Sequence, residues 1–161
     1  GDEDEEEVKS WSFNVDAALA MNKQIALKGE FFVGENMGQY LGAVGQNVNP
    51  EGEALPTMGL WGMLSITPKP RLNLNFGYGM DDPDEEEWNC PDDGEAYELK
   101  DMNSVFFGNI FYSVNKNVTA IFEVAWMKTE YLSRVNDGID IVDTATDYDN
   151  LRFQFALKCG I

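Results

Sequence analysis

The stretch NLRFQFALK, residues 150–158, alternates in hydrophobicity from one residue to the next. Leu151, Phe153, Phe155 and Leu157 are apolar, and the residues between them are polar or small. A period of two is typical of a β-strand with one dry face and one wet face. The fold therefore depends on what the dry face contacts, which is either a protein core or lipid.

Similar alternation occurs in most of the acid-poor parts of the chain. It is weaker in residues 58–67, where we expect Leu60, Leu64 and Ile66 to share the apolar face, and residues 104–114 are apolar on both faces. Each stretch approaches the length of a tilted transmembrane strand, about 9–11 residues. The sequence thus predicts an all-β chain with seven strands, at about 10–19, 24–33, 58–67, 71–80, 104–114, 118–130 and 149–159.

The connections between these strands alternate in length. Short ones are expected near residues 21–23, 68–70 and 115–117, and long ones at about 34–57, 81–103 and 131–148. Up-and-down strands would place every long loop at one end of the sheet and every short turn at the other. This separation is typical of an outer-membrane β-barrel, whose long loops are extracellular and whose short turns are periplasmic.

The charge of the chain excludes several classes of function. The formal net charge is −18, and most of the 29 acidic residues lie in residues 1–7 and in the long connections. Such a chain repels the phosphates of nucleic acid. There is no run of 18 apolar residues, so no transmembrane helix is expected. Histidine is absent and no nucleophile–base pair can be argued, so we do not expect an enzyme.

The wet face of the predicted strands carries both signs of charge. Charged side chains are costly to bury in a dry core but are easily hydrated in a water-filled lumen. We therefore expect the apolar face to contact lipid, with an aromatic girdle that includes Trp11, Tyr78, Trp126 and Tyr131. The charged residues either select permeating solutes or simply pair across strands. The pore-lining candidates are Asp16, Lys28, Glu30, Arg71, Glu123, Arg152 and Lys158.

Seven strands do not suit a closed bacterial barrel, which normally has an even number of strands, eight or more. An open sheet would expose unpaired edges to lipid, which is forbidden. We expect residues 1–9 to be an acidic extracellular segment. Residues 10–161 would then be the C-terminal portion of a larger antiparallel up-and-down transmembrane β-barrel.

Several motifs resemble the C-terminal region of DcaP-like porins. They are GEFFVGENMGQYLG at 29–42, WGMLSITPKPRLNLNFGYGMDDPDEEE at 61–87, NIFYSVNKNVTAIFEVAWMKTEY at 109–131 and the final NLRFQFALK. The resemblance implies a homotrimeric channel in a Gram-negative outer membrane, in contact with lipid and lipopolysaccharide, for small and often anionic or aromatic solutes. One departure is the chain end at residues 158–161, KCGI, where barrel proteins usually carry an aromatic residue.

The stretch DDPDEEEWNCPDDGE, residues 81–95, is rich enough in carboxylates to attract calcium. It lacks the ligand spacing of an EF-hand, so we expect no specific cofactor and only loosely bound Ca²⁺ or Mg²⁺. Cys90 lies in this predicted loop and Cys159 at the opposite end of the last strand, so no disulfide between them is expected. The weak calcium candidates are Asp81, Asp82, Asp84, Asp92 and Asp93.

These features predict a porin that passes small solutes or ions by passive diffusion. The glycine-rich residues 34–42 are expected to bend the chain near a strand end, and folding inward to narrow the pore is a further option. One alternative is a structural or adhesive surface barrel with acidic ion- or partner-binding loops and no open pore. Another is a soluble, secreted β-sandwich or binding barrel. The selectivity stays open, because the resemblance implies anions whereas acidic loops concentrate cations.

Overall fold

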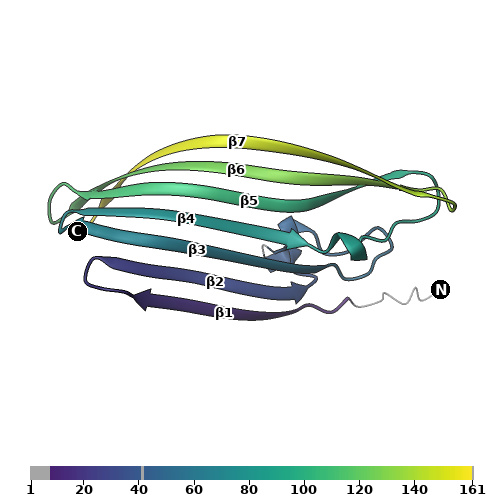
Figure 1. Cartoon of the computed structure of the whole chain (residues 1–161), viewed down its shortest axis with the longest axis horizontal. Helices are drawn as coiled ribbons and strands as arrows, with labels where there is room; N and C mark the ends of the chain where they lie inside the picture. Colours follow the sequence, from purple (N-terminus) through teal and green to yellow (C-terminus); the bar gives the residue numbers. More distant parts are fainter. Residues whose placement is uncertain (1–7, 41, 161) are drawn as a thin grey trace.

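The computed structural model describes residues 8–40 and 42–160. It is a single antiparallel sheet of seven strands in sequential order, which confirms the predicted all-β, up-and-down arrangement (Figure 1). No described helix is long and apolar enough to cross a membrane. The strands are β1 Trp11–Ala20, β2 Ile25–Glu35, β3 Pro56–Lys69, β4 Leu72–Pro83, β5 Ala96–Ser113, β6 Val118–Asn136 and β7 Ile141–Cys159, and the 3₁₀ helices are η1 Gly38–Tyr40, η2 Ala43–Gly45 and η3 Glu85–Glu87.

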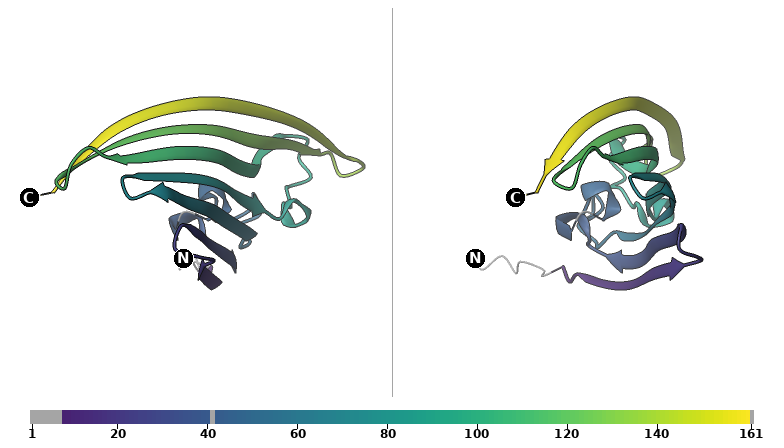
Figure 2. Two further views of the ribbon diagram at one scale, coloured as in Figure 1. Left: turned by 60° about the vertical axis from the view of Figure 1, so that its left-hand side comes forward. Right: turned by 90° about the vertical axis from the view of Figure 1, so that its left-hand side faces the viewer.

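The sheet curves into an arc and does not close. Strands β1 and β7 are its two edges and do not pair with each other (Figure 2). Each edge therefore leaves one side of its backbone without a ladder partner in the described chain. The curvature gives the sheet a convex face and a concave face, and the chain alone forms only part of a cylinder.

Short turns join the strands at one end, where the sequence predicts them. The Asn22 side chain accepts hydrogen bonds from the backbone N–H groups of Gln24 and Ile25 at 2.8 and 2.9 Å, which closes the β1–β2 turn. Residues 70–71 join β3 to β4, and residues 114–117 join β5 to β6. Two prolines flank Lys69, and their missing N–H groups help to end the ladder there.

The last three strands are longer than predicted, and one expected loop does not exist. Strands β5, β6 and β7 extend through residues 96–103, 131–136 and 141–148. The connection expected at 131–148 is only the tight turn 137–140, in which Asp137 accepts hydrogen bonds from the N–H groups of Ile139 and Asp140. Residues 131–148 form a hairpin, here called the projecting hairpin. Both faces of its second strand, residues 141–148, are exposed, so this part of β7 lacks the apolar alternation that marks the other strands.

A dry core occurs only at the long-loop end of the described chain. Its buried residues come from the connections 36–55 and 84–95 and from the projecting parts of β5 and β6. Along the rest of the strands the large apolar side chains are exposed or half-buried instead. The core members are Ala43, Leu55, Trp88, Leu99 and Leu132.

The acidic segment expected at residues 1–9 lies mostly outside the described residues. Val8 and Lys9 are exposed and precede β1 without forming a strand. The Asn36 amide donates a hydrogen bond to the Val8 backbone carbonyl at 3.2 Å, so the chain enters β1 from the long-loop end.

Candidate functional site

The register of the strands separates apolar and polar side chains onto the two faces. For example, Leu19 faces Leu27, Leu27 faces Leu64, and Leu64 faces Phe76 on adjacent strands. On β7 the side chains of Phe153, Phe155 and Leu157 are 63%, 68% and 59% exposed. We call this convex surface the apolar band; its exposed members include Phe13, Val15, Leu19, Leu27, Phe31, Leu60, Phe76, Phe106, Ile110, Tyr112, Phe122, Trp126, Leu151, Phe153, Phe155 and Leu157.

Aromatic rings mark the border of the apolar band toward the long loops. The ring centroids of Tyr78 and Phe106 are 4.5 Å apart, and those of Phe106 and Trp126 are 6.0 Å apart. Beyond this row, the Trp126 indole N–H donates to the Asp149 carboxylate at 3.2 Å. The row therefore stands where an apolar surface meets a polar one, which is the usual place of membrane-interface aromatics.

Tyr131, which the sequence analysis placed in the girdle, lies on the other face. Its ring meets that of Tyr148 edge to face, with centroids 5.6 Å apart. Tyr131 is an odd-numbered residue of β6 and Trp126 an even-numbered one, so their side chains leave the strand in opposite directions. The prediction was wrong because it considered only how close Tyr131 lies to the strand end, and not which face of the strand its side chain leaves.

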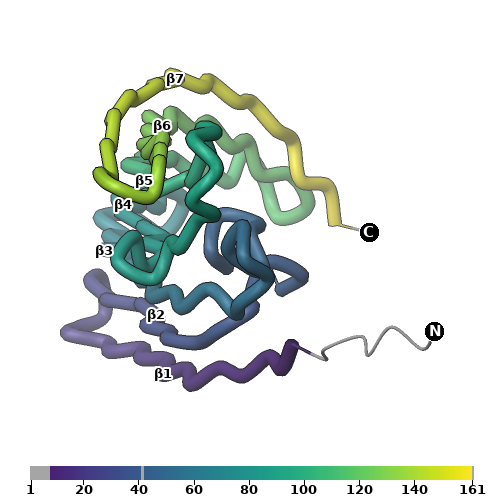
Figure 3. The backbone as a smooth tube through the Cα atoms, turned by 90° about the vertical axis from the view of Figure 1, so that its right-hand side faces the viewer, coloured from purple at the N-terminus to yellow at the C-terminus, as the bar shows by residue number. Residues whose placement is uncertain are grey.

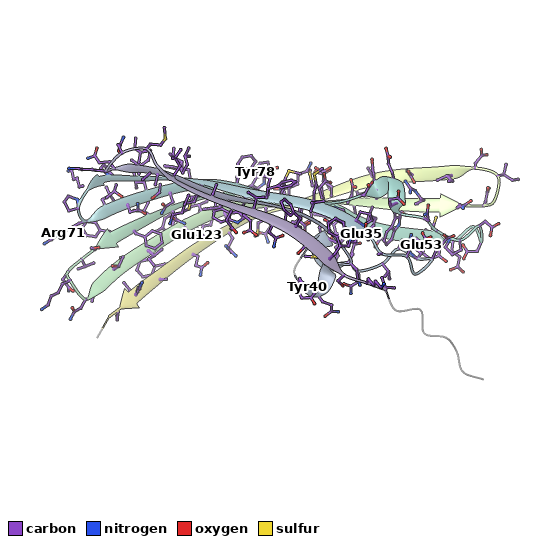
Figure 4. All side chains as sticks on the ribbon, turned by 90° about the horizontal axis from the view of Figure 1, so that it is seen from below. Glu35, Tyr40, Glu53, Arg71, Tyr78 and Glu123 are labelled. Carbon is purple, nitrogen blue, oxygen red and sulfur yellow. The ribbon has the colours of Figure 1, made fainter. Side chains whose placement is uncertain are left out.

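The predicted pore-lining residues lie mainly on the concave face. The register places Asp16, Lys28, Glu30, Glu123, Arg152 and Lys158 together there. Arg71 lies in the β3–β4 turn, at the rim of the sheet. In Figure 4, Tyr78 lies on one side of the sheet and Glu123 and Tyr40 lie on the other.

A continuous hydrogen-bonded polar belt crosses five strands of the concave face. The Asn73 amide donates to Ser65 Oγ at 2.9 Å, and the Asn75 amide donates to the side-chain oxygens of Asn73 and Asn109 at 2.7 and 2.8 Å. The belt continues with Asn109 donating to Glu123 at 3.3 Å and Arg152 donating to Glu123 at 2.8 Å. Each residue of the belt shares at least one hydrogen bond with another member, so this part of the concave face is polar and its side chains hold one another in place.

The first three strands carry a different set of charges on the concave face. Asp16 and Glu30 are direct cross-strand neighbours, and such like charges normally repel. The Trp61 indole N–H donates to Glu30 at 2.9 Å. Lys28 is exposed two register pairs nearer the turns, on the same face. Two like charges side by side are tolerable where water screens them, and costly in a dry core.

Residues 36–40 and 42–55, here called the inward segment, lie against the concave face (Figure 3). This confirms the predicted bend in residues 34–42 and also places the chain inside the arc. The Asp81 carboxylate accepts hydrogen bonds from the backbone N–H groups of Ala43 and Val44 at 3.1 and 2.7 Å, and from the Thr57 hydroxyl at 3.0 Å. One carboxylate of the wall thus holds the segment in place.

The backbone at the Asp81 contact has an unusual conformation. Ala43, Val44 and Gly45 have φ angles of 51°, 49° and 80°. A left-handed conformation is strained for a β-branched residue such as Val44, and it turns successive N–H groups toward one anion. We therefore infer that Asp81 stabilises a local conformation that the segment would not adopt alone. Gln46 adds a second attachment through two 2.9 Å hydrogen bonds with the Lys100 backbone.

Two glycines let aromatic rings lie flat on the concave wall. A Cβ atom added to Gly59 would collide with the Phe32 ring, and one added to Gly77 would collide with the Phe107 ring. Glycine at these positions keeps both rings against the sheet and out of the space within the arc.

The five weak calcium candidates do not form one site. Asp81 holds the inward segment, and Asp84 caps η3 by accepting the Glu86 N–H at 3.0 Å. Asp93 accepts the Tyr97 hydroxyl at 2.8 Å and the Glu95 N–H at 2.9 Å. Asp82 lines an acidic hollow of about 590 Å³ on the convex side, and Asp92 is exposed. Within residues 8–40 and 42–160, no three acidic, Cys or His residues are grouped to hold a metal.

Arg134 joins the connection 84–95 to the projecting hairpin, outside the apolar band. Its guanidinium pairs with both Asp143 oxygens at 2.8 and 2.9 Å and donates to the backbone carbonyls of Glu85 and Trp88 at 3.0 and 2.7 Å. Arg134 lowers the pKa of the Asp143 carboxyl by hydrogen bonding and by its charge. The pair therefore stabilises this end at neutral pH, and that stabilisation is lost as acid protonates Asp143.

We expect Arg134→Ala to lower the free energy of opening the connection 84–95 by about 2–3 kcal/mol, because two carbonyls and a carboxylate lose their hydrogen-bond donor. Cys90 is a built-in reporter, since its thiol is buried beside Arg134 and is free. Its rate of reaction with a thiol reagent should rise on this substitution, while the exposed Lys100→Ala control should leave it unchanged. An unchanged rate in Arg134→Ala would show that the guanidinium does not hold the loop.

The two cysteines lie at opposite ends of the sheet and do not form a disulfide. Cys90 is buried among the loops, and Cys159 is exposed at the end of β7 next to the short turns. This agrees with the prediction.

Comparison of the sequence and structure with protein-family models, curated proteins and solved structures gives no match. The site is therefore interpreted from its own geometry.

Proposed function

We propose that this chain forms part of the wall of a larger outer-membrane β-barrel, a porin for passive diffusion of small solutes or ions. The observation that carries the proposal is the polarity of the sheet. Large apolar side chains cover the convex face, whereas charged and amide side chains cover the concave face. A soluble barrel or sandwich would need the reverse arrangement.

Energetics favour lipid outside and water inside. Apolar surface gains roughly 25 cal/mol per Å² when it leaves water, and the apolar band extends across all seven strands. Charged side chains facing lipid would cost about 2–4 kcal/mol for Arg or Lys at the midplane. Lys28 and Arg152 avoid that cost by facing the concave side.

The unpaired edges support closure by further strands. A transmembrane sheet must pair every backbone group, so β1 and β7 each require a neighbour. Both strands run from the long-loop end to the short-turn end. Antiparallel closure therefore needs an odd number of additional strands, which makes the total even, as in known bacterial barrels.

The charges on the concave face and at the long-loop end support a preference for cations. Glu123 and Arg152 form an ion pair at 2.8 Å, so their charges cancel on the concave face. Opposite the apolar band, the first two strands then carry two negative charges, Asp16 and Glu30, and one positive charge, Lys28. The long-loop end adds the acidic residues of the connections and of the projecting hairpin. A cleft lined with one sign of charge concentrates counter-ions.

The sequence resemblance to DcaP-like porins agrees with this proposal and extends it to a homotrimer with extracellular long loops and periplasmic turns. In that setting the acidic loops would face lipopolysaccharide and its divalent cations.

The test is single-channel recording after reconstitution into a planar bilayer. We expect discrete, voltage-independent conductance steps from protein that has inserted. Protein that inserts and gives no conductance would favour a structural or adhesive barrel whose lumen the inward segment fills. Protein that stays soluble without detergent would contradict both membrane functions.

Cation preference depends on the concave carboxylates. The double variant Asp16→Asn/Glu30→Gln should shift the reversal potential in a salt gradient toward less cation preference, because both negative charges leave the pathway. Asp84→Asn/Glu86→Gln is the matched control, since these residues line the convex hollow. Equal shifts in the two variants would show that only the overall charge matters.

A further inference from the structure

The short-turn end of the sheet carries only positive charge in the described chain. Five basic residues lie there, all exposed, and no acidic residue accompanies them. The nearest acidic side chains along the strands, Asp16 and Glu123, are further up the concave wall, and Glu123 is already paired with Arg152. Lys158 faces the concave side and is left out of the set. The other four, Lys23, Lys69, Arg71 and Lys116, lie at the turns or next to them, and we call them the basic rim.

The basic rim begins where the apolar band ends. Arg71 directly precedes Leu72, the first residue of β4. Lys69 is the register partner of Leu72 after the irregularity in β3. In a membrane-spanning sheet, residues at this level meet the lipid headgroups, and long basic side chains can keep their alkyl stems on apolar surface while their charged ends reach the phosphates.

We propose that the basic rim binds the headgroups of anionic phospholipids in the leaflet at the short-turn end. The inference rests on the proposed membrane function. Its basis is charge complementarity, because uniformly positive side chains border an apolar surface at headgroup depth. Each basic residue near an anionic membrane surface contributes about a fivefold increase in affinity. The acidic long-loop end cannot compete for these lipids, because it repels them.

Geometry assigns different contacts to the rim residues. Arg71 presents a planar guanidinium that can hold a phosphate through two hydrogen bonds, whereas the lysines act as point charges. Its backbone carbonyl accepts the Ser113 N–H at 2.9 Å, so the turn that carries Arg71 is tied to β5. This bond holds the backbone from which the guanidinium extends.

Energy transfer from a dye on Cys159 tests the proposal. Cys159 is exposed at the same end as the rim, and Cys90→Ser removes the other thiol. The labelled protein is reconstituted into phosphatidylcholine vesicles containing one-quarter phosphatidylglycerol, with the acceptor on one headgroup or the other. We expect more transfer to phosphatidylglycerol than to phosphatidylcholine. Lys69→Gln/Arg71→Gln/Lys116→Gln should abolish most of the difference, and Lys100→Gln at the opposite end should preserve it.

Equal transfer to the two lipids from the unsubstituted protein would overturn the proposal, and so would an excess that survives the triple substitution. If the triple variant does not fold, 1 M salt replaces it, because a screening length of about 3 Å should also remove the excess. Flotation of the vesicles after a urea wash separates this inference from the function. Protein that does not float contradicts the membrane function, whereas protein that floats without lipid preference contradicts only the basic rim.

Discussion

Phe153→Arg/Phe155→Arg is expected to prevent stable insertion into a bilayer. Both side chains lie in the middle part of the apolar band and are 63% and 68% exposed. An arginine facing lipid near the midplane costs about 2–4 kcal/mol, so two would cost about 4–8 kcal/mol. Urea titration of folding into vesicles measures the loss, which should approach or exceed the whole stability of an ordinary domain.

Gln154→Arg is the matched control for this experiment. Gln154 lies between the two phenylalanines on β7 but faces the concave side, where it is the register partner of Glu123. A new arginine there enters water beside a carboxylate and should change the free energy of unfolding by less than about 1 kcal/mol. A result in which Gln154→Arg is as harmful as the double substitution would remove the distinction between the two faces.

Asp81→Ala is expected to release the inward segment and to raise single-channel conductance. The carboxylate accepts three hydrogen bonds, two of them from strained left-handed backbone at Ala43 and Val44. Hydrogen bonds to a charged group contribute about 1.5–3 kcal/mol each. Relief of the left-handed strain at Ala43 and Val44 offsets part of the sum of these three bonds. A net loss of about 3 kcal/mol would raise the population of the released segment about a hundredfold. The recordings should then show larger and noisier conductance steps.

Asp82→Ala separates release of the inward segment from simple loss of one negative charge. Asp82 adjoins Asp81 on β4 but points to the convex side, into the acidic hollow. The Asp82→Ala substitution should leave the conductance of the open channel unchanged. Identical conductance in Asp81→Ala and the unsubstituted protein would show that the inward segment does not restrict the pathway, even though it lies within the arc.

The period of two was sufficient to predict the strand order and the faces of most strands. It assigned Leu60, Leu64 and Ile66 to the apolar face of β3, and the register agrees, because they pair with Phe31, Leu27 and Ile25. The short turns were also predictable, because prolines and asparagines have local conformational preferences that do not depend on distant parts of the chain.

Other features depended on information that the local sequence does not carry. Residues 141–148 form a strand whose two faces are both wet, so the signal that identified the other strands is missing there. Asp81 was grouped with calcium candidates because of its acidic neighbours. Its actual partners, Ala43 and Val44, are far away in the sequence, and only the folded sheet brings them together. The polar belt likewise requires the register of five strands before its amides can be paired.

The most direct measurement of the central claim compares two native tryptophans. Trp126 lies on the convex face and Trp61 on the concave face, where it donates to Glu30. Variants that keep only one of these tryptophans, with phenylalanine at the other tryptophan positions, would be reconstituted into vesicles. Quenching by brominated lipid reports contact with acyl chains, and quenching by iodide reports contact with water.

If the convex face meets lipid and the concave face meets water, brominated lipid quenches Trp126 strongly and Trp61 weakly. Iodide then quenches Trp61 strongly and Trp126 weakly. Strong lipid quenching of Trp61 together with iodide quenching of Trp126 would contradict the account, because the concave face would then be the one that meets the membrane.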